Sequence, residues 1–224
     1  MAHTHNSQSL DVNDAVAQSE AFLIKHRNTL IIAAIALVVV VGGFFALKSF
    51  YFAPRAEKAS TMLAQGEDYF DSGDFATALN GDGKGFIGYV KIAKEYGSTD
   101  AGNLANLYAG ICYAQQGKTK EAIPYLENYD VQDDVTISPA ALNTLANCYA
   151  ANNQLDKAVE TFKKAAKLSG ENSLAPICLK SAALILESQN KKAEALALYQ
   201  QIKTDYVTSI TAQDIDKYIE RVSK

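Results

Sequence analysis

Few side chains in this chain of 224 residues have the chemistry of a catalytic or metal-binding centre. The three histidines are His3, His5 and His26, so every position after residue 26 lacks an imidazole. This excludes a histidine-based triad, a histidine-ligated metal and a histidine general base from the long carboxy-terminal part. The 21 Lys and Arg residues against 25 Asp and Glu residues leave a net charge of −4. Without a basic surplus to neutralise phosphates, the chain is not expected to bind nucleic acid.

The three cysteines are the remaining candidates for nucleophiles or metal ligands. Cys112 and Cys148 each directly precede a tyrosine, at equivalent places of a repeated pattern, and Cys178 lies early in a later predicted helix. Three cysteines are too few for a disulfide framework. Equivalent points on stacked helices are also about 8–10 Å apart, which is beyond the reach of an unstrained disulfide. We therefore expect these cysteines to be small, buried, unreactive core residues.

A glycine-rich segment, GDGKG at residues 81–85, invites two binding hypotheses. It lacks the spacing of a phosphate-binding P-loop, since residue 78 is alanine and no hydroxyl residue follows the lysine. As a calcium loop it would place Lys84 at a ligand position and Lys91 where a bidentate glutamate belongs. Acidic residues elsewhere cluster at predicted turns, where carboxylates cap helices and stay hydrated; a paired-carboxylate hydrolase has no further support. The sequence thus predicts no catalytic residue, no cofactor and no metal.

A fixed pattern of residues recurs four times after residue 60. In each copy a small residue precedes a large anchor residue by three positions, a turn-forming residue follows the anchor by four, and an alanine follows it by nine. The four copies are Gly66, Tyr69, Gly73 and Ala78; Gly110, Tyr113, Gly117 and Ala122; Ala146, Tyr149, Asn153 and Ala158; and Ala183, Leu186, Asn190 and Ala195. The anchors recur after 44, 36 and 37 residues, a period typical of stacked helix-turn-helix repeats. An irregular helical bundle is the alternative.

Local signals place the ends of several helices. Glycines within Gly81–Gly88 must break the second helix of the first copy, and an apolar helix face resumes over 86–96. Thr99 and Ser138, the latter followed by proline, have the residue types of helix caps. The stretch Thr211–Val222 has apolar residues at helical spacing and charged residues between them, as in an amphipathic capping helix.

The amino-terminal part contains a predicted membrane span. Asn28 to Leu47 are 20 consecutive uncharged residues, and a helix of that length spans about 30 Å, the thickness of a bilayer core. A cleaved signal peptide is disfavoured because the apolar stretch is longer and begins later than such peptides do. Basic residues flank both ends, so charge does not decide the orientation. Before the span, Val12, Val16 and Leu23 form one stripe, which suits a surface-lying helix, a partner-binding helix or a frayed tail equally.

The second and third copies of the pattern resemble the tetratricopeptide repeat. They match it through Gly110, Tyr113, Gly117 and Ala122, and through Ala146, Tyr149, Ala158, Phe162 and Ala165. One span entered by FLIKHRNTL, with such repeats and YGSTDAGNLANLYAG after it, is similar to the YfgM-like family of bacterial inner-membrane proteins. This resemblance implies a cytoplasmic tail at 1–27, a membrane helix at 28–47 and a periplasmic repeat domain at 48–224. It also implies a role beside the Sec translocon, with emerging clients passed to periplasmic chaperones.

The predicted working surface is the face formed by the first helix of each hairpin. The residues expected there for partner binding are Glu67, Phe70, Leu107, Ile111, Asn143, Asn147, Lys180, Leu184 and Glu187. Asn147 and Lys180 loosely match the basic groove with which some repeats of this type clamp a terminal carboxylate, but the rest of that set is missing. The mixture suits extended peptide backbone or a helix laid in a groove. Packing of Leu107, Ile111 and Leu184 against neighbouring helices is the alternative.

These patterns predict an all-α protein: a membrane helix, about four tetratricopeptide-like hairpins and a capping helix. The expected partners are Sec translocon subunits, periplasmic chaperones or client polypeptides, and membrane lipid. The alternative function is a structural scaffold that self-associates to organise an envelope complex. An enzyme ranks third, because no motif supports one.

Overall fold

The computed structural model describes residues 8–170 and 173–224, and the secondary structure within these ranges is entirely helical. This confirms the predicted all-α fold class. Residues 1–7, with two of the histidines and the start of the predicted tail, lie outside the described residues. The chain divides into two compact units, one ending at Pro54 and the other running from Arg55 to Lys224.

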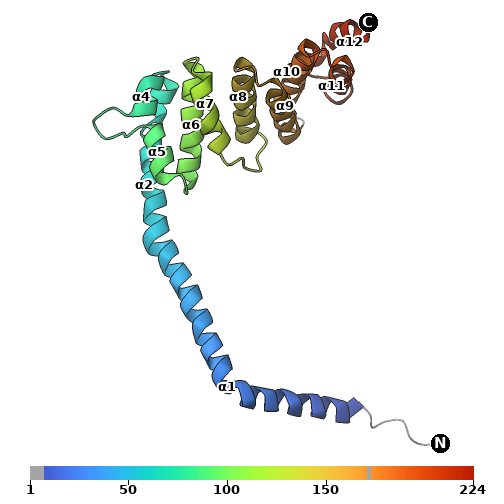
Figure 1. Ribbon diagram of the computed structural model, residues 1–224. Coiled ribbons are helices and arrows are strands. Elements are labelled where there is room, and N and C mark those ends of the chain that lie inside the picture. The colour runs from blue at the N-terminus through green and yellow to red at the C-terminus, as the bar shows by residue number, and fades with distance from the viewer. Residues whose placement is uncertain (1–7, 171–172) are drawn as a thin grey trace, which may run out of the picture. The chain divides into compact units, whose positions relative to one another are not determined.

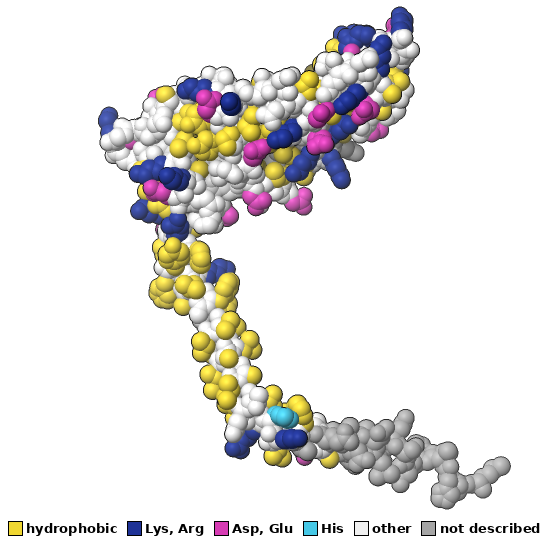
Figure 2. Space-filling view, in the orientation of Figure 1, with side chains coloured by type: hydrophobic (Ala, Val, Ile, Leu, Met, Phe, Trp, Pro, Cys, Tyr) yellow, Lys and Arg dark blue, Asp and Glu magenta, His cyan; other side chains and the backbone are white. Residues whose placement is uncertain are grey.

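The first unit is dominated by one long helix. Helix α1 (Gln8–Leu47) continues into the π-helical turn η1 (Lys48–Phe52). Its apolar side chains point outward, with Ile32, Val38 and Val40 between 67% and 69% exposed, and Figure 2 shows apolar side chains along the coloured part of the helix. Among the described residues one helical stretch, Phe22–Asp71, is long and apolar enough to cross a membrane. Residues 8–27 are helical as part of α1, but the predicted stripe includes Val12, whose side chain is not described.

The second unit is a row of helical hairpins (Figure 1). Its helices are α2 (Ala53–Ala64), α3 (Glu67–Asp71), α4 (Phe75–Asn80), α5 (Tyr89–Tyr96), α6 (Asp100–Gln115), α7 (Thr119–Asn128), α8 (Ile137–Ala151), α9 (Leu155–Ser169), α10 (Leu174–Ser188), α11 (Lys192–Asp205), the 3-10 turn η2 (Ile210–Ala212) and α12 (Ile215–Ser223). Helices α6/α7, α8/α9 and α10/α11 form three regular hairpins, each packed on the next. Helices α3 to α5 pack on one another and on α6 as an irregular first repeat, to whose core α2 contributes Ala59 and Leu63, and α12 packs on α11. The buried ends of α12, Ile215 and Val222, confirm the predicted capping helix.

The repeated residues occupy the places that the pattern predicts. All four turn positions have left-handed backbone, with φ of +77° at Gly73, +74° at Gly117, +57° at Asn153 and +59° at Asn190. Glycine and asparagine adopt this conformation at least cost, which explains why these two types recur there. The small residue also works as predicted, because a Cβ on Gly110 would lie 2.5 Å from a Leu126 side-chain carbon.

The anchor residues and cysteines belong to the core. Tyr149 and Leu186 are 6% and 2% exposed, and Tyr69 and Tyr113 are partly buried against the core clusters. All three cysteines are free and buried, as expected. Burial raises the pKa of Cys112 to about 12 and that of Cys178 to about 11. Their thiols are therefore protonated and unreactive at neutral pH.

The glycine-rich segment interrupts the first repeat, as predicted, but α5 begins at Tyr89 and not at residue 86. The reason is the compact loop before it. One carboxylate oxygen of Asp82 accepts hydrogen bonds from the backbone N–H groups of Lys84, Gly85 and Phe86 at 2.7–3.1 Å, and the other accepts from the Tyr69 hydroxyl at 3.0 Å. The bond from the Lys84 amide is the main cause that holds the pKa of Asp82 below its usual value. These bonds hold Phe86 in the loop and delay the helix.

The predicted cap at Ser138 is wrong, because α8 begins one residue earlier, at Ile137. The carboxylate of Asp134 instead accepts from the backbone N–H groups of Thr136 and Ser138 at 2.9 and 3.2 Å. A carboxylate binds several such donors more strongly than a hydroxyl does. Ser138 is fully buried, and its hydroxyl accepts a hydrogen bond from the backbone N–H of Gln132 at 2.9 Å. This hydrogen bond joins the loop before α8 to the first turn of the helix.

Candidate functional site

The first helices of the regular hairpins, α6, α8 and α10, present equivalent residues on one face. These residues stand nine, five and two positions before each anchor, and we call their surface the first-helix face. It consists of Leu104, Tyr108 and Ile111; Ala140, Thr144 and Asn147; and Ile177, Ser181 and Leu184. The first-helix face includes three of the predicted partner-binding residues: Ile111, Asn147 and Leu184.

The first-helix face is uncharged, with apolar side chains on both sides of a polar strip. On α10, Ile177 and Leu184 are 48% and 41% exposed. On α8, Thr144 donates to the Ala140 carbonyl at 2.9 Å and Asn147 donates to the Asn143 carbonyl at 2.8 Å. The donors of α8 are thus partly occupied by their own helix. The surface offers apolar contact and amide groups, and no reactive group.

Several other predicted residues contribute mainly to packing. The Phe70 ring lies 4.9 Å from the Tyr108 ring and is partly buried. Leu107 is 5% exposed and belongs to the core, as the packing alternative proposed for it. Asn143 accepts a hydrogen bond from the Cys178 thiol at 3.5 Å, so it joins α8 to α10. Glu67, in contrast, is exposed.

The two charged residues predicted on α10 are held by the capping helix. The Lys180 ammonium lies 3.8 Å from a carboxylate oxygen of Asp214 and 4.5 Å from the centre of the Tyr218 ring. Glu187 accepts from the Arg221 guanidinium at 2.8 Å and from the Tyr199 hydroxyl at 2.5 Å. A carboxylate clamp would therefore have to compete with α12 for Lys180.

The contacts of Glu187 with Arg221 and Tyr199 also lower its pKa. Burial by itself would raise this pKa, but the hydrogen bonds from Arg221 and Tyr199 outweigh it, and the pKa lies below its ordinary value. The carboxylate is therefore ionised at neutral pH and bound within the repeat end.

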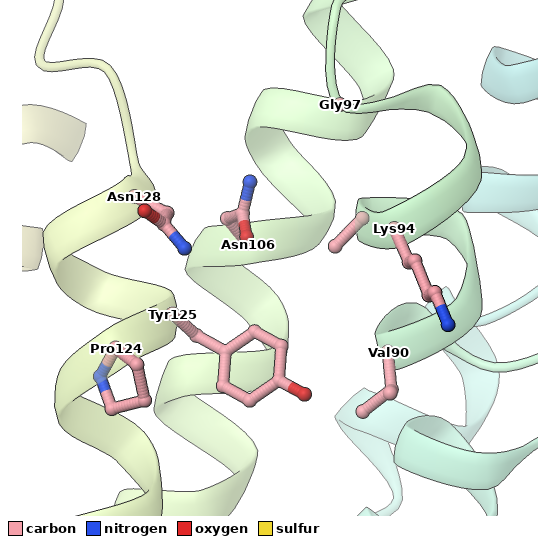
Figure 3. Close-up of a pocket in the computed structure, with 8 residues that line it drawn as sticks. Val90, Lys94, Gly97, Asn106, Pro124, Tyr125 and Asn128 are labelled. Atoms are coloured by element: carbon pink, nitrogen blue, oxygen red, sulfur yellow. The ribbon is translucent and has the colours of Figure 1, made fainter.

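The structure also contains a groove that the sequence reasoning missed. It has a volume of about 610 Å³, and residues of α5, α6 and α7 line it (Figure 3). We call it the α5–α7 groove, and it is lined by Val90, Ala93, Lys94, Gly97, Asn106, Pro124, Tyr125 and Asn128. Two sequence signals could have revealed it: an asparagine where later repeats have leucine, and a proline within a helix.

No group of three or more His, Cys, Asp or Glu side chains in the described ranges is arranged to hold a metal ion. The acidic residue of the glycine-rich loop, Asp82, is committed to hydrogen bonds within the loop.

Comparison with known proteins identifies the type of repeat. Two family models, both described as tetratricopeptide repeat, match residues 113–175 and 179–209. The chain is 35% identical over 89 residues to the photosystem I assembly protein Ycf3 of Parasynechococcus marenigrum (strain WH8102). It is 30% identical over 86 residues to the protein of the same name from Prochlorococcus marinus (strain NATL2A). Each match covers 38% of this chain, and the chain spans about half the length of these curated relatives (48%).

A solved structure agrees with the fold. The crystal structure of nearly identical TPR-like repeats, from a Podosopora anserina protein assigned as a kinesin light chain, superposes with a TM-score of 0.55 at 14% identity. The match covers 75% of this chain and 86% of that one; at this identity it shows the fold alone. The second unit therefore has the fold of a tetratricopeptide-repeat solenoid, and two parts of it, 113–175 and 179–209, match models of that repeat.

Proposed function

We propose that this protein is a membrane-anchored module that binds polypeptides beside the Sec translocon and hands clients to periplasmic chaperones. The observation that carries the binding role is the first-helix face, because exposed Ile177 and Leu184 on α10 lie beside a neutral strip on α8. Such a face buries apolar side chains of a partner without requiring a charge on it.

The chemistry of the face favours internal segments of a polypeptide over a chain terminus. Lys180, the one ammonium predicted for a terminal carboxylate, is paired with Asp214 and Tyr218. The relatives in the comparison are named as assembly proteins, which supports a role in handling polypeptides before they reach their final complex.

The proposed location rests on helix α1 and on the resemblance to the YfgM-like family. We place 1–27 in the cytoplasm, 28–47 in the inner membrane and 48–224 in the periplasm. The exposed apolar surface of α1 supports the membrane assignment, because water does not tolerate so long an apolar helix surface.

Site-specific photocrosslinking in cells tests the partner. A photoreactive phenylalanine at Thr144, in the middle of the first-helix face, should crosslink to translocon subunits and to client polypeptides. The same residue at Glu160, which is exposed on α9, is the matched control and should yield neither. Crosslinks only to a second copy of the chain would instead support the self-associating scaffold.

Protease protection tests the topology separately. The second unit should be digested once the outer membrane is permeabilised while the inner membrane remains intact. If it stays protected until the inner membrane is opened, the periplasmic location is wrong, whereas the crosslinking result still decides whether the face binds polypeptides.

A further inference from the structure

The α5–α7 groove contains a polar residue at a position that the other repeats keep apolar. Asn106 stands seven residues before its anchor, and the equivalent residues in the next two repeats are Leu142 and Leu179. Those leucines are 5% and 4% exposed and belong to the core. Asn106 is itself only 9% exposed. A buried carboxamide costs stability unless its hydrogen-bonding groups find partners, so leucine would serve this position better if it were only structural.

The carboxamide of Asn106 is only partly satisfied by the protein. Its amide nitrogen donates to the Gly102 carbonyl at 3.3 Å, a long bond. The rest of the group lies in the groove, where Figure 3 shows it beside the carboxamide of Asn128, with the Tyr125 ring next to them. Two carboxamides therefore line the same groove, one from α6 and one from α7.

A second departure from the repeat pattern lies on the same groove. Pro124 is the sixth residue of α7, well inside the helix, and it lacks the N–H that would bond to the carbonyl of Lys120. The equivalent residues in α9 and α11 are Glu160 and Ala197. Residues that break local folding rules concentrate at functional sites. Two such residues line this groove.

The groove is distinct from the first-helix face. Asn106 is two residues from both Leu104 and Tyr108, which is about 200° around the helix at 3.6 residues per turn. A ligand in the α5–α7 groove thus contacts the opposite side of α6 from a ligand on the first-helix face.

We propose that the α5–α7 groove is a second binding site, which takes an extended internal segment of a polypeptide through its backbone amides. A carboxamide has an acceptor oxygen and two N–H donors, so it can pair with both the N–H and the C=O of one residue in an extended peptide. Val90, Ala93 and Pro124 supply apolar walls for flanking side chains. Lys94 is the only charged residue of the lining, which disfavours phosphates and other multiply charged ligands. The volume suits a few residues and not a folded domain.

The site can be tested with peptides selected for it. A phage-displayed library of random 12-residue peptides is selected on the full chain in detergent micelles, after counter-selection on the double variant Asn106→Leu, Asn128→Ala. Selected peptides are synthesised with blocked ends, and their Kd is measured by fluorescence anisotropy. Each single variant should weaken binding about tenfold, the loss of roughly one good hydrogen-bonding group.

Three controls establish whether binding depends on the carboxamides of this groove. Leu184→Asp should leave the Kd of these peptides unchanged, because it alters only the first-helix face. Peptides N-methylated at alternate backbone positions should lose binding. Asn106→Leu should not lower the Tm and should raise it by about 2–4 °C, since it restores the core residue of the repeat.

Several results would overturn the proposal. They are the failure of any peptide to survive counter-selection, equal binding of N-methylated peptides, and a lowered Tm of Asn106→Leu, which would make the carboxamide structural. Binding only of peptides with a free carboxylate, lost in Lys94→Met, would replace an internal segment by a chain terminus. None of these results bears on crosslinking at Thr144, so this site and the proposed function can fail independently.

Discussion

The hydroxyl of Tyr89 has no hydrogen-bond partner within the described ranges, although the side chain is fully buried. Its ring lies 5.6 Å from that of Phe86 and 5.1 Å from that of Tyr108. Burial is the main cause that raises the pKa of this tyrosine, so the hydroxyl stays neutral.

Replacing Tyr89 by phenylalanine should stabilise the second unit by about 1 kcal/mol, because it removes an unsatisfied polar group and keeps the ring. The measurement is urea unfolding of the parent and the variant. The matched control is Tyr69→Phe, which removes the hydrogen bond to Asp82 and should lower the free energy of unfolding. A loss of stability in Tyr89→Phe would mean that the hydroxyl has a partner such as a buried water.

A side-chain amide three residues after the anchor joins neighbouring hairpins. Asn152 donates to the Thr119 hydroxyl at 2.8 Å, and Gln189 donates to Asp156 at 3.0 Å. Both partners lie 33 residues earlier in the chain. The equivalent amide nitrogen of Gln116 is buried without a partner in the described part of the chain. The partners Thr119 and Asp156 stand six and seven residues after their anchors, and the residues at these positions after Tyr69 are Phe75 and Ala76, which have no polar side chain.

At the scale of elements, α5 and α6 meet through a glycine. A Cβ on Gly102 would lie 1.9 Å from the carbonyl oxygen of Tyr96. The first turn of α6 is thus in direct contact with the backbone that ends α5.

The variant Gly102→Ala should therefore destabilise the second unit by about 2–4 kcal/mol, since backbone must move to admit the methyl group. The comparison is Gly117→Ala, which has φ +74° and open space around it and should cost about 1 kcal/mol. Thermal unfolding measures both. Equal losses would contradict the predicted close approach.

The capping helix should loosen in acid. The pKa values of Glu187 and Asp214 lie below their ordinary values; the hydrogen bond from Lys217 is the main cause at Asp214. Carboxyl groups with lowered pKa stabilise the fold above their unfolded pKa, about 4, and this stabilisation is lost as pH falls through the folded pKa. The hydrogen-exchange protection factors of α12 should fall between about pH 5 and pH 3, ahead of those of α8.

The variant Glu187→Gln should lower the free energy of opening of α12, measured by hydrogen exchange at pH 7, by about 1 kcal/mol. It should also make the protection of α12 depend less on pH. Glu220→Gln is the control, because its ion pair with Lys224 is exposed and contributes little. If both variants behave like the parent, α12 is held by its apolar contacts alone.

At the scale of the whole molecule, the first-helix face should be separable from stability. Leu184→Asp should weaken binding of polypeptides recovered by crosslinking at Thr144 about tenfold or more, because it places a charge on an apolar contact surface. Its Tm should change by no more than about 2 °C, as expected for an exposed position. Pull-down of the purified partner measures the first effect, and unchanged binding would exclude this face as the site.

Much of this architecture could be predicted from residue spacing. Turn residues such as Gly117 and Asn153, and small residues such as Gly110, recur at fixed intervals because each repeat solves the same packing problem. Helix boundaries were less predictable: Asp134 replaced Ser138 as a cap, and Asp82 delayed α5. Both differences arise from a carboxylate that binds several backbone donors in a loop, which no helical period records.

The amino-acid sequence by itself determined the all-α class, the hairpin repeat, the long apolar helix and the burial of the cysteines, because these follow from periodicity and composition. Only the tertiary structure decided which polar residues remain available to a partner. Lys180 and Glu187 are held by α12, and Asn106 faces a groove, because each outcome depends on side chains that come together from different helices.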